Sequence, residues 1–482
     1  MIIERMLIGG KWTTARDGGT IPVINPATEE VFAKVPKAGR IDAEDAIKAA
    51  DAAFESWSSL TPFERGSFLR RAGEIVLRNE DKIAELMTME QGKPFREALG
   101  EVRKGAQILR YYAEEGERIC GRIIPNADSN CESSVIYQPV GVAAAISPWN
   151  YPIELLAWKV GGALASGCTI VAKVPSETPL SPIAFIRCIE EASIPDGVIN
   201  LITGYGSEIG PVLTESPLVK KVAFTGSTKT GRQVLKSCAD TFKRVSLELG
   251  GSLPMIVCSD CDLSAAVKGA VRRSFRNMGQ ICIAINRIYV DRTIYEKFID
   301  KFAVQTQKLT IGNGLEKDCD LGPMATPTGI KKAEEHIKDA ISKGAQLVCG
   351  GKKPQGAEYE KGYFFEPTII RDVNHDMLIM KEETFGPVVG VMPFDTTDEA
   401  VSLANDCIYG LAAIIFTESL SLAHQLSHAI RAGNVAVNNV DAGVINAPYG
   451  GWKDSGFGHE HGTEGLYEYL NIKHIRTCRL PR

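Results

Sequence analysis

Apolar residues recur at helical spacing in the first quarter of the chain. Between residues 41 and 117 the spacing of three and four predicts amphipathic helices, with Asp42 as the N-cap of the first and further helices from Pro62 through Tyr112. The apolar face of the first helix consists of Ala46, Ile47, Ala50, Ala53, Phe54 and Trp57.

The pattern changes after Arg122. Residues 133–139 alternate between apolar and polar, as in an exposed strand. Short apolar runs then alternate with helical segments at intervals of about 25 to 30 residues, which is typical of βαβ units and predicts a parallel sheet with helices on both faces. Ligands of such sheets bind at the carboxyl ends of the strands. The runs are residues 140–147, 169–173, 198–204, 221–226 and 245–250.

A second alternating block extends from Leu253 to about Pro448 and predicts a second α/β unit. The tail, residues 465–480, has the pattern of a strand through Tyr467, Tyr469 and further apolar residues. We expect this tail to pair either with residues 133–139 or with another subunit.

Composition narrows the function classes. A chain of 482 residues indicates two or three domains, and its net charge of −5 lacks the basic footprint of a nucleic-acid or anionic-membrane partner. The first residues lack the apolar core of a secretory signal, and no apolar run approaches the ~20 residues of a spanning helix. We therefore expect a cytoplasmic protein without a membrane or nucleic-acid partner.

The cysteines support this expectation. All 12 are scattered through the chain, which favours a reduced context over a disulfide framework. The closest pair, Cys258 and Cys261, has no second pair and no histidine cluster beside it, so we expect no metal site.

Three segments contain candidate chemistry, although each has an ordinary structural interpretation. Cys282 follows Gly279 among apolar neighbours, where most cysteines are buried and inert. Glu248 ends an apolar run before two glycines; most such carboxylates are solvated, but one that faces a cleft can be a general base. Asn150 lies between Pro148 and Pro152 in what is either a rigid turn or a held amide donor for an oxyanion.

Together these segments resemble the signature regions of the aldehyde dehydrogenase superfamily. Residues 147–152, 247–251 and 279–282 resemble three signatures, and residues 382–387 and 448–456 resemble two more, in the family's order from about Ile24 to the C-terminus. The resemblance implies an α/β fold with three parts. These are a parallel-sheet cofactor domain (1–119 and 140–250), an α/β catalytic domain (251–449) and small β oligomerisation strands (120–139 and 465–482).

The resemblance also implies a reaction. Cys282 is the expected nucleophile, because its thiolate attacks the aldehyde carbon. The Asn150 amide and the Cys282 backbone N–H are expected to hold the oxyanion, where one donor typically contributes ~3 kcal/mol. Hydride transfer to the nicotinamide then leaves a thioester, and Glu248 activates the water that hydrolyses it to an acid.

Two alternatives remain open. A coenzyme A-acylating semialdehyde dehydrogenase would pass the acyl group to a thiol, but such family members commonly lack the glutamate that Glu248 resembles. A non-catalytic structural member of the fold is disfavoured because Cys282, Glu248 and Asn150 are all present.

The cofactor is expected to be NADP or NAD. Gly226 and Ser227 follow an apolar run and open a predicted helix, whose N-terminus favours a pyrophosphate. The resemblance places Glu383 at the nicotinamide ribose and Phe385 beside the nicotinamide. Residues 204–210 resemble a glycine-rich dinucleotide pattern outside its usual place, and we treat them as secondary. The full expected set is Ile146, Trp149, Lys173, Ser176, Glu177, Gly206, Gly226, Ser227, Gly231, Leu249, Glu383 and Phe385.

One position bears on the choice of cofactor. Lys173 resembles the lysine at the adenosine ribose, and many NAD-preferring members have a glutamate three residues later, where this chain has Ser176. A glutamate there would repel a 2′-phosphate, whereas a serine would not. We therefore expect NADP to be accepted, and the alternative is that Glu177 swings in and restores a preference for NAD.

The substrate is expected to be a small aldehyde. Arg276 lies six residues before Cys282, as in succinate-semialdehyde dehydrogenases, where this arginine holds the distal carboxylate. Trp158 replaces that subfamily's second arginine, so the resemblance is partial. Arg276 either binds a polar, anionic aldehyde bidentately or pairs with Glu154 or another carboxylate and orders the wall.

The expected tunnel residues are Tyr151, Glu154, Leu155, Trp158, Arg276, Ile281, Ile283 and Tyr449, with Asp441 and Gly443 nearby. The family resemblance further implies a homodimer or homotetramer in which the tail strand joins sheets across subunits.

Overall fold

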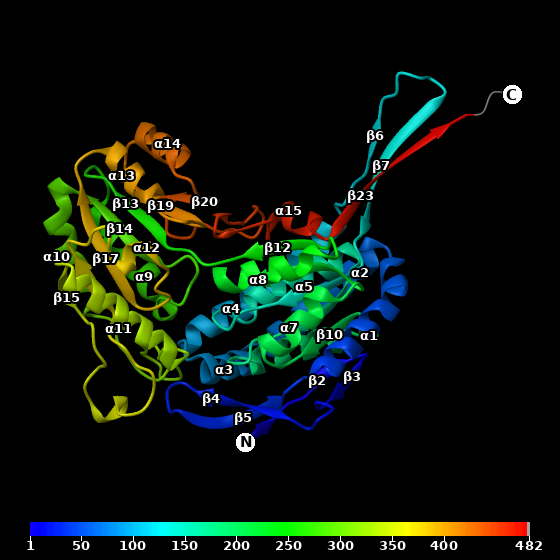
Figure 1. Cartoon of the computed structure of the whole chain (residues 1–482), viewed down its shortest axis with the longest axis horizontal. Helices are drawn as coiled ribbons and strands as arrows, with labels where there is room; N and C mark the ends of the chain where they lie inside the picture. Colours follow the sequence, from blue (N-terminus) through cyan, green and yellow to red (C-terminus); the bar gives the residue numbers. More distant parts are fainter. Residues whose placement is uncertain (480–482) are drawn as a thin grey trace.

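The computed structural model describes residues 1–479 and has the expected α/β fold. Two sheet-containing halves lie side by side, and a narrow β arm projects from one of them (Figure 1). The halves contain an eight-stranded and a seven-stranded sheet, and the arm is a three-stranded sheet. The domain boundaries themselves stay a prediction, and residues 450–464, which it left unassigned, return to the first half through β22 (Gly456–Phe457).

The predicted helical region consists of four helices, α1 (Arg40–Ser58), α2 (Pro62–Arg78), α3 (Glu80–Gln91) and α4 (Phe95–Gly116). The predicted N-cap of the first helix is wrong. Gly39 is the N-cap, and Asp42 lies in the first turn, where its carboxylate accepts from the Gly39 N–H at 2.9 Å. Asp42 therefore satisfies the end of α1 from inside the helix.

The five apolar runs all form strands, and neighbouring strands pair in parallel as predicted. Their spatial order is β12 (Arg244–Glu248), β11 (Val219–Thr225), β8 (Val142–Ile146), β9 (Thr169–Lys173) and β10 (Ile199–Ile202). The connecting helices are α5 (Glu154–Ser166), α6 (Leu180–Glu191), α7 (Gly206–Glu215) and α8 (Thr228–Ala239). The edges of this sheet are β22 on one side, and β2 (Met6–Ile8) and β3 (Lys11–Thr13) on the other.

This sheet is buried on both faces. Ala143 and Ala145 of β8 pack into one apolar cluster, and Val142 and Ala144 pack into another. Because successive side chains of a strand point to opposite faces, each run is continuously apolar. The carboxyl ends of β8, β11, β12 and β9 consequently meet at one edge, which faces the second half.

The second half is built in the same way. Its sheet order is β15 (Gln346–Cys349), β16 (Thr368–Arg371), β17 (Val388–Phe394), β14 (Ile285–Asp291), β13 (Leu253–Val257), β19 (Ala412–Phe416) and β20 (Asn434–Val437). Its helices are α9 (Leu263–Phe275), α10 (Tyr295–Thr306), α11 (Pro327–Ser342), α12 (Leu378–Lys381), α13 (Thr397–Asn405) and α14 (Leu420–Ala429). Smaller strands are β1 (Ile2–Ile3), β4 (Thr20–Asn25), β5 (Glu30–Pro36), β18 (Tyr409–Gly410) and β21 (Trp452–Lys453).

The arm contains β6 (Arg122–Ile124), β7 (Cys131–Pro139) and β23 (Leu470–Cys478). β23 pairs antiparallel with β7 along its whole length, so the first of the two expected pairings occurs within the chain. The strand begins later than predicted, because Tyr467 ends the short helix α15 (Gly462–Tyr467) and Tyr469 is buried. Residues 480–482 of the predicted tail lie outside the described residues.

One cysteine pair departs from the expected reduced state. Cys131 and Cys478 lie opposite each other in β7 and β23 and form a disulfide, and the other ten cysteines are free. Their spacing along the chain could not indicate this, because the two strands are 347 residues apart. Within residues 1–479, no helix is long and apolar enough to cross a membrane.

The disulfide predicts a thiol count. Unfolded under non-reducing conditions, the oxidised chain should expose ten thiols, and reduction should raise the number to all 12. Cys131→Ser should raise the non-reducing count by one, because it frees Cys478. Thiol titration in denaturant measures this, and 12 thiols without a reductant would contradict the pairing.

Candidate active site

The loop before Cys282 has an unusual backbone. α9 ends at Phe275, and Asn277, Met278 and Gly279 then adopt positive φ angles of 49°, 57° and 67°. Such angles in non-glycine residues cost of order 1–3 kcal/mol each and persist only when the surroundings impose them. Here the Gln91 side chain donates to Asn277 Oδ1 at 2.9 Å. The loop therefore holds Cys282 in a defined position.

Glycines let three sequence motifs meet at this loop. A Cβ on Gly279 would lie 2.2 Å from the Gly386 carbonyl oxygen, and one on Gly251 would lie 2.3 Å from the Cys282 carbonyl oxygen. No side chain fits at such distances. The segments that contain Glu248, Cys282 and Glu383 are thus in backbone contact.

Asn150 is fixed beside the nucleophile. The side-chain Nδ2 of Asn150 donates to the Gln280 carbonyl oxygen at 2.9 Å. The backbone carbonyl oxygen of Asn150 accepts from Lys93 Nζ at 2.7 Å and from Asn277 Nδ2 at 3.1 Å. An amide nitrogen has two hydrogens, so one remains available. This arrangement can present a donor to an oxyanion at Cys282.

Two cavities share Cys282 and Asn150. A cavity of about 280 Å³ is lined by Trp149, Gly226, Ser227, Leu249, Lys332, Glu383 and Phe385. A second cavity of about 420 Å³ is lined by Tyr151, Glu154, Trp158, Arg273, Arg276, Ile281, Ile283, Tyr449 and His461. Cys282 therefore lies where a cofactor cavity and a substrate tunnel join.

The environment keeps the Cys282 thiol protonated at neutral pH. Burial, together with the charges of Glu248 and Glu383, raises its pKa to about 12, against smaller lowering effects of Tyr449 and Arg273. Thiolate formation therefore requires that the proton be removed during the reaction or that positive charge arrive.

Glu248 is also buried, at 5% exposure, and its Oε1 has no hydrogen-bond partner among the described residues. Burial and the nearby Glu460 hold its pKa well above the ordinary value, and Lys159 opposes them. The Lys159 ammonium lies 2.6 Å from Glu460 Oε1, so it is largely engaged there. A carboxyl of raised pKa is a stronger base than an exposed one, which suits proton abstraction from water.

The smaller cavity fits the nicotinamide end of a dinucleotide. The rings of Trp149 and Phe385 meet edge to face at 5.4 Å, and Glu383 Oε1 accepts from the Gly251 N–H at 3.1 Å. Burial raises the pKa of Glu383 to about 7. Lys332 donates to the Glu383 carbonyl oxygen. Sequence reasoning missed Lys332, because a single lysine on α11 belongs to no recognisable motif.

The other predicted cofactor residues lie outside this cavity, toward the carboxyl ends of β8 and β9. Ile146 and Lys173 are paired in register there, and the buried ammonium group of Lys173 has no hydrogen bond or ion pair among the described residues. A Cβ on Gly206, the first residue of α7, would lie 4.0 Å from Lys173 Nζ. Ser227 caps α8, as its predicted helix start requires. These donors fit an anionic dinucleotide.

Gly231 packs closely against Leu249, because a Cβ on Gly231 would lie 2.4 Å from Leu249 Cδ2. Ser176 donates to the Gly204 carbonyl oxygen at 3.1 Å, and Glu177 is exposed. The structure therefore places Ser176 beside the glycine-rich segment that the sequence ranked as secondary.

The tunnel wall contains an aromatic stack. The ring of His461 lies 3.5 Å from Trp158 and 4.9 Å from Tyr449, nearly parallel to both. Burial lowers the pKa of His461 to about 3, so this imidazole is neutral. His461 was missed from the sequence, since only the return of residues 450–469 to the first half brings it there.

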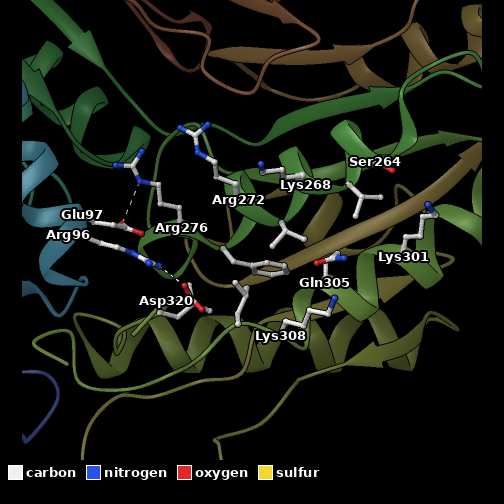
Figure 2. Close-up of a pocket in the computed structure, with 15 residues that line it drawn as sticks. Arg96, Glu97, Ser264, Lys268, Arg272, Arg276, Lys301, Gln305, Lys308 and Asp320 are labelled. Carbon is white, nitrogen blue, oxygen red and sulfur yellow. Dashed lines mark hydrogen bonds and ion pairs between the residues drawn. The ribbon is translucent and has the colours of Figure 1, made fainter. Parts of the chain in front are cut away.

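Arg276 pairs with a carboxylate, although not with Glu154. Its Nε lies 3.5 Å from Glu97 Oε2, and Figure 2 shows the two side chains pointing toward each other. The Glu97 side chain is mostly buried, at 14% exposure, and burial raises its pKa. Glu97 Oε2 has no hydrogen-bond partner among residues 1–479, so this ion pair is loose. Arg276 lines both the tunnel and a basic groove of about 880 Å³, so its side chain lies between the two.

Comparison with known proteins agrees with this geometry. The model of the aldehyde dehydrogenase family matches residues 12–475, so the chain belongs to this family. It is 45% identical over 97% of its length to the mitochondrial succinate-semialdehyde dehydrogenase of Oryza sativa subsp. japonica, covering 88% of that protein. It is 44% identical to the glutarate-semialdehyde dehydrogenase of Pseudomonas aeruginosa, covering 98% of this chain and 97% of the other.

A solved structure is similarly close. The crystal structure of an E. coli NADP-dependent enzyme matches with a TM-score of 0.97 and 42% identity, over 99% of this chain and 98% of the other. The chain is therefore an oxidoreductase that oxidises an aldehyde to the carboxylic acid with NAD(P)⁺.

The raised pKa of Cys282 predicts how the free enzyme is alkylated. Between about pH 7 and about pH 9, iodoacetamide inactivation should accelerate roughly tenfold per pH unit, because the thiolate fraction grows tenfold per unit below the pKa. Initial inactivation rates measure this, with Cys282→Ser as the background for other thiols. A plateau below about pH 8 would show that the thiol ionises readily.

Proposed function

We propose that this enzyme oxidises a short aldehyde with a distal carboxylate, of the succinic or glutaric semialdehyde type, to the dicarboxylic acid. The observation that carries the proposal is Arg276, which lines the same tunnel as Cys282 and has only the loose contact with Glu97. The names of the two semialdehyde dehydrogenases reported above support the same substrate class.

The proposed reaction begins with Cys282. Its sulfur bonds to the aldehyde carbon as its proton leaves, and the carbonyl oxygen becomes an oxyanion that the Asn150 amide and the Cys282 N–H stabilise. The bound dinucleotide supplies a hydride acceptor. Loss of hydride from the carbon leaves a thioester on Cys282. Glu248 then takes a proton from water, whose oxygen bonds to the acyl carbon as the carbon–sulfur bond breaks, and this proton is returned to the departing Cys282 sulfur.

Burial strengthens the electrostatic interactions on which these steps depend. Glu248 is buried and Cys282 is half-buried, and desolvation raises the pKa of both groups. Electrostatic interactions there are stronger than in water. Water as acyl acceptor fits the buried carboxyl of Glu248, and a coenzyme A-acylating reaction stays the alternative, which an acyl-coenzyme A product would reveal.

Arg276→Gln tests the substrate class. The KM for succinic semialdehyde should rise roughly 10- to 100-fold, the size expected when a charge-assisted hydrogen bond is lost, and the KM for butanal should change far less. Initial-rate kinetics on both aldehydes measure the difference. Lys268→Gln, in the adjoining groove, is the matched control for loss of one positive charge nearby. An equal loss on both aldehydes would show that Arg276 only orders the wall.

We further propose that NADP is accepted at least as well as NAD. Lys173 is a buried cation without an ion-pair partner in the described chain, and Ser176 brings no negative charge beside it. A 2′-phosphate near the ribose would supply the missing partner. The similar E. coli enzyme of known structure is described as NADP-dependent, which supports this proposal.

Ser176→Glu should lower kcat/KM for NADP at least tenfold and leave NAD nearly unaffected, because the new carboxylate repels the phosphate. Glu177→Gln is the companion variant, and it should change the ratio little if Glu177 stays exposed as it is here. A large wild-type advantage for NAD that Glu177→Gln removes would instead assign the preference to Glu177.

A homodimer or homotetramer built with the arm is proposed as well. β23 has eight exposed residues in succession and an open edge, the kind of surface that pairs with another chain. The cytoplasmic location stays a prediction, supported by ten free cysteines against one disulfide.

A further inference from the structure

A second arginine faces the substrate tunnel. Arg273 lies in the last turn of α9, Arg276 follows the end of that helix three residues later, and both line the cavity that contains Cys282. Because both side chains border this cavity, the two guanidinium groups can approach one ligand. The sequence drew no attention to Arg273, because the run Arg272-Arg273 looks like an ordinary basic helix end.

The hydrogen-bonding capacity of Arg273 is mostly unused. The residue is 5% exposed, yet within residues 1–479 only its Nη2 has a partner, which is Asp441. Its Nε is buried without a partner. Buried polar groups are normally satisfied, so an unpaired guanidinium donor beside a cavity indicates a missing ligand.

The one partner of Arg273 neutralises it incompletely. Asp441 is 40% exposed and also pairs with Arg272 at 2.9 Å. One half-exposed carboxylate thus serves two guanidinium groups. Arg272 itself is 50% exposed and lies toward the basic groove in Figure 2, whereas Arg273 is the member of the pair that lines the tunnel.

The remaining acidic groups of the tunnel do not compensate. Glu101 is engaged by Lys93 at 2.5 Å and by the backbone N–H of Ile153 at 2.9 Å. Burial raises the pKa of Glu154, which favours its neutral form. The tunnel therefore has excess positive charge, and Trp158 adds none. Buried cations without counter-ions are costly, and an anionic ligand removes that cost.

The charge of Arg273 also acts on the reacting sulfur. It lowers the pKa of Cys282 and of Tyr449, and Arg276 and Arg273 both lower the pKa of Tyr151 on the wall of the same tunnel. A short substrate that reaches Cys282 with its aldehyde carbon would thus have its other end close to both guanidinium groups.

We propose that Arg273 is a further specificity-determining residue, which binds the distal carboxylate of the semialdehyde together with Arg276. This inference rests on the proposed function. Two guanidinium groups offer enough donors for both oxygens of a carboxylate, and Arg273 supplies the second cation that position 158 does not. The rival interpretation is that Arg273 only fastens the loop containing Asp441 to α9.

Three variants separate these interpretations. Arg273→Gln removes the cation, Asp441→Asn removes the fastening carboxylate, and Arg272→Gln removes the other arginine that shares Asp441. Each is assayed with succinic semialdehyde and with butanal, at about 0.2 M salt so that surface charges are screened. The readout is the ratio of kcat/KM for the two aldehydes.

Arg273→Gln should lower this ratio at least tenfold through KM, and Arg273→Lys should restore part of it. Asp441→Asn and Arg272→Gln should leave the ratio within about twofold of the wild type, since neither removes the tunnel cation. The proposal is overturned if Asp441→Asn lowers the ratio as much as Arg273→Gln does. It is also overturned if Arg273→Gln lowers kcat/KM equally for both aldehydes.

A binding measurement covers the case in which Arg273→Gln turns over poorly. Butyrate, a carboxylate without an aldehyde, should inhibit butanal oxidation competitively, and its inhibition constant should rise at least fivefold in Arg273→Lys. An unchanged constant would overturn the proposal. Failure of the proposed function itself looks different, because the wild type would then show no preference for the semialdehyde over butanal and Arg276→Gln would have no selective effect.

Discussion

The active site depends on direct backbone contact between segments that are far apart in the sequence. Gly251 packs against the carbonyl of Cys282, and Gly279 packs against the carbonyl of Gly386, at distances that exclude any side chain. These contacts join the first sheet, the nucleophile loop and the segment of Glu383. Asn277 and Met278 keep their left-handed backbone conformation because this packing imposes it on the loop.

That close packing explains the electrostatics of the site. The junction keeps much of the solvent away from Cys282 and Glu248, so both groups favour their neutral forms. The same exclusion makes each remaining charge effective over several residues, including the field of Arg273 on the thiol. An enzyme that must deprotonate a thiol and later a water benefits from bases that are strong, and desolvation supplies that strength.

The charge of the tunnel walls is opposite in sign to the net charge of the chain. The chain carries a net charge of −5, whereas the walls around Arg273 and Arg276 contain cations whose acidic neighbours are shared, buried or otherwise engaged. The aromatic stack of Trp158, His461 and Tyr449 adds surface without charge. The anionic substrate that we propose would supply the missing counter-ion, a basis for selection that does not depend on shape alone.

The sequence alone determined the secondary structure of the first sheet and the identity of the reaction. Continuous apolar runs at βαβ spacing identify a doubly covered parallel sheet, and Cys282, Glu248 and Asn150 lie in short contiguous motifs. Tertiary structure decided what depends on contacts between distant segments. These are the Cys131–Cys478 disulfide, the choice of Glu97 as the partner of Arg276, and the positions of Lys332, His461 and Arg273 in the cavity walls. A local pattern reports which face of a helix or strand is buried, but not which side chain from another element it meets there.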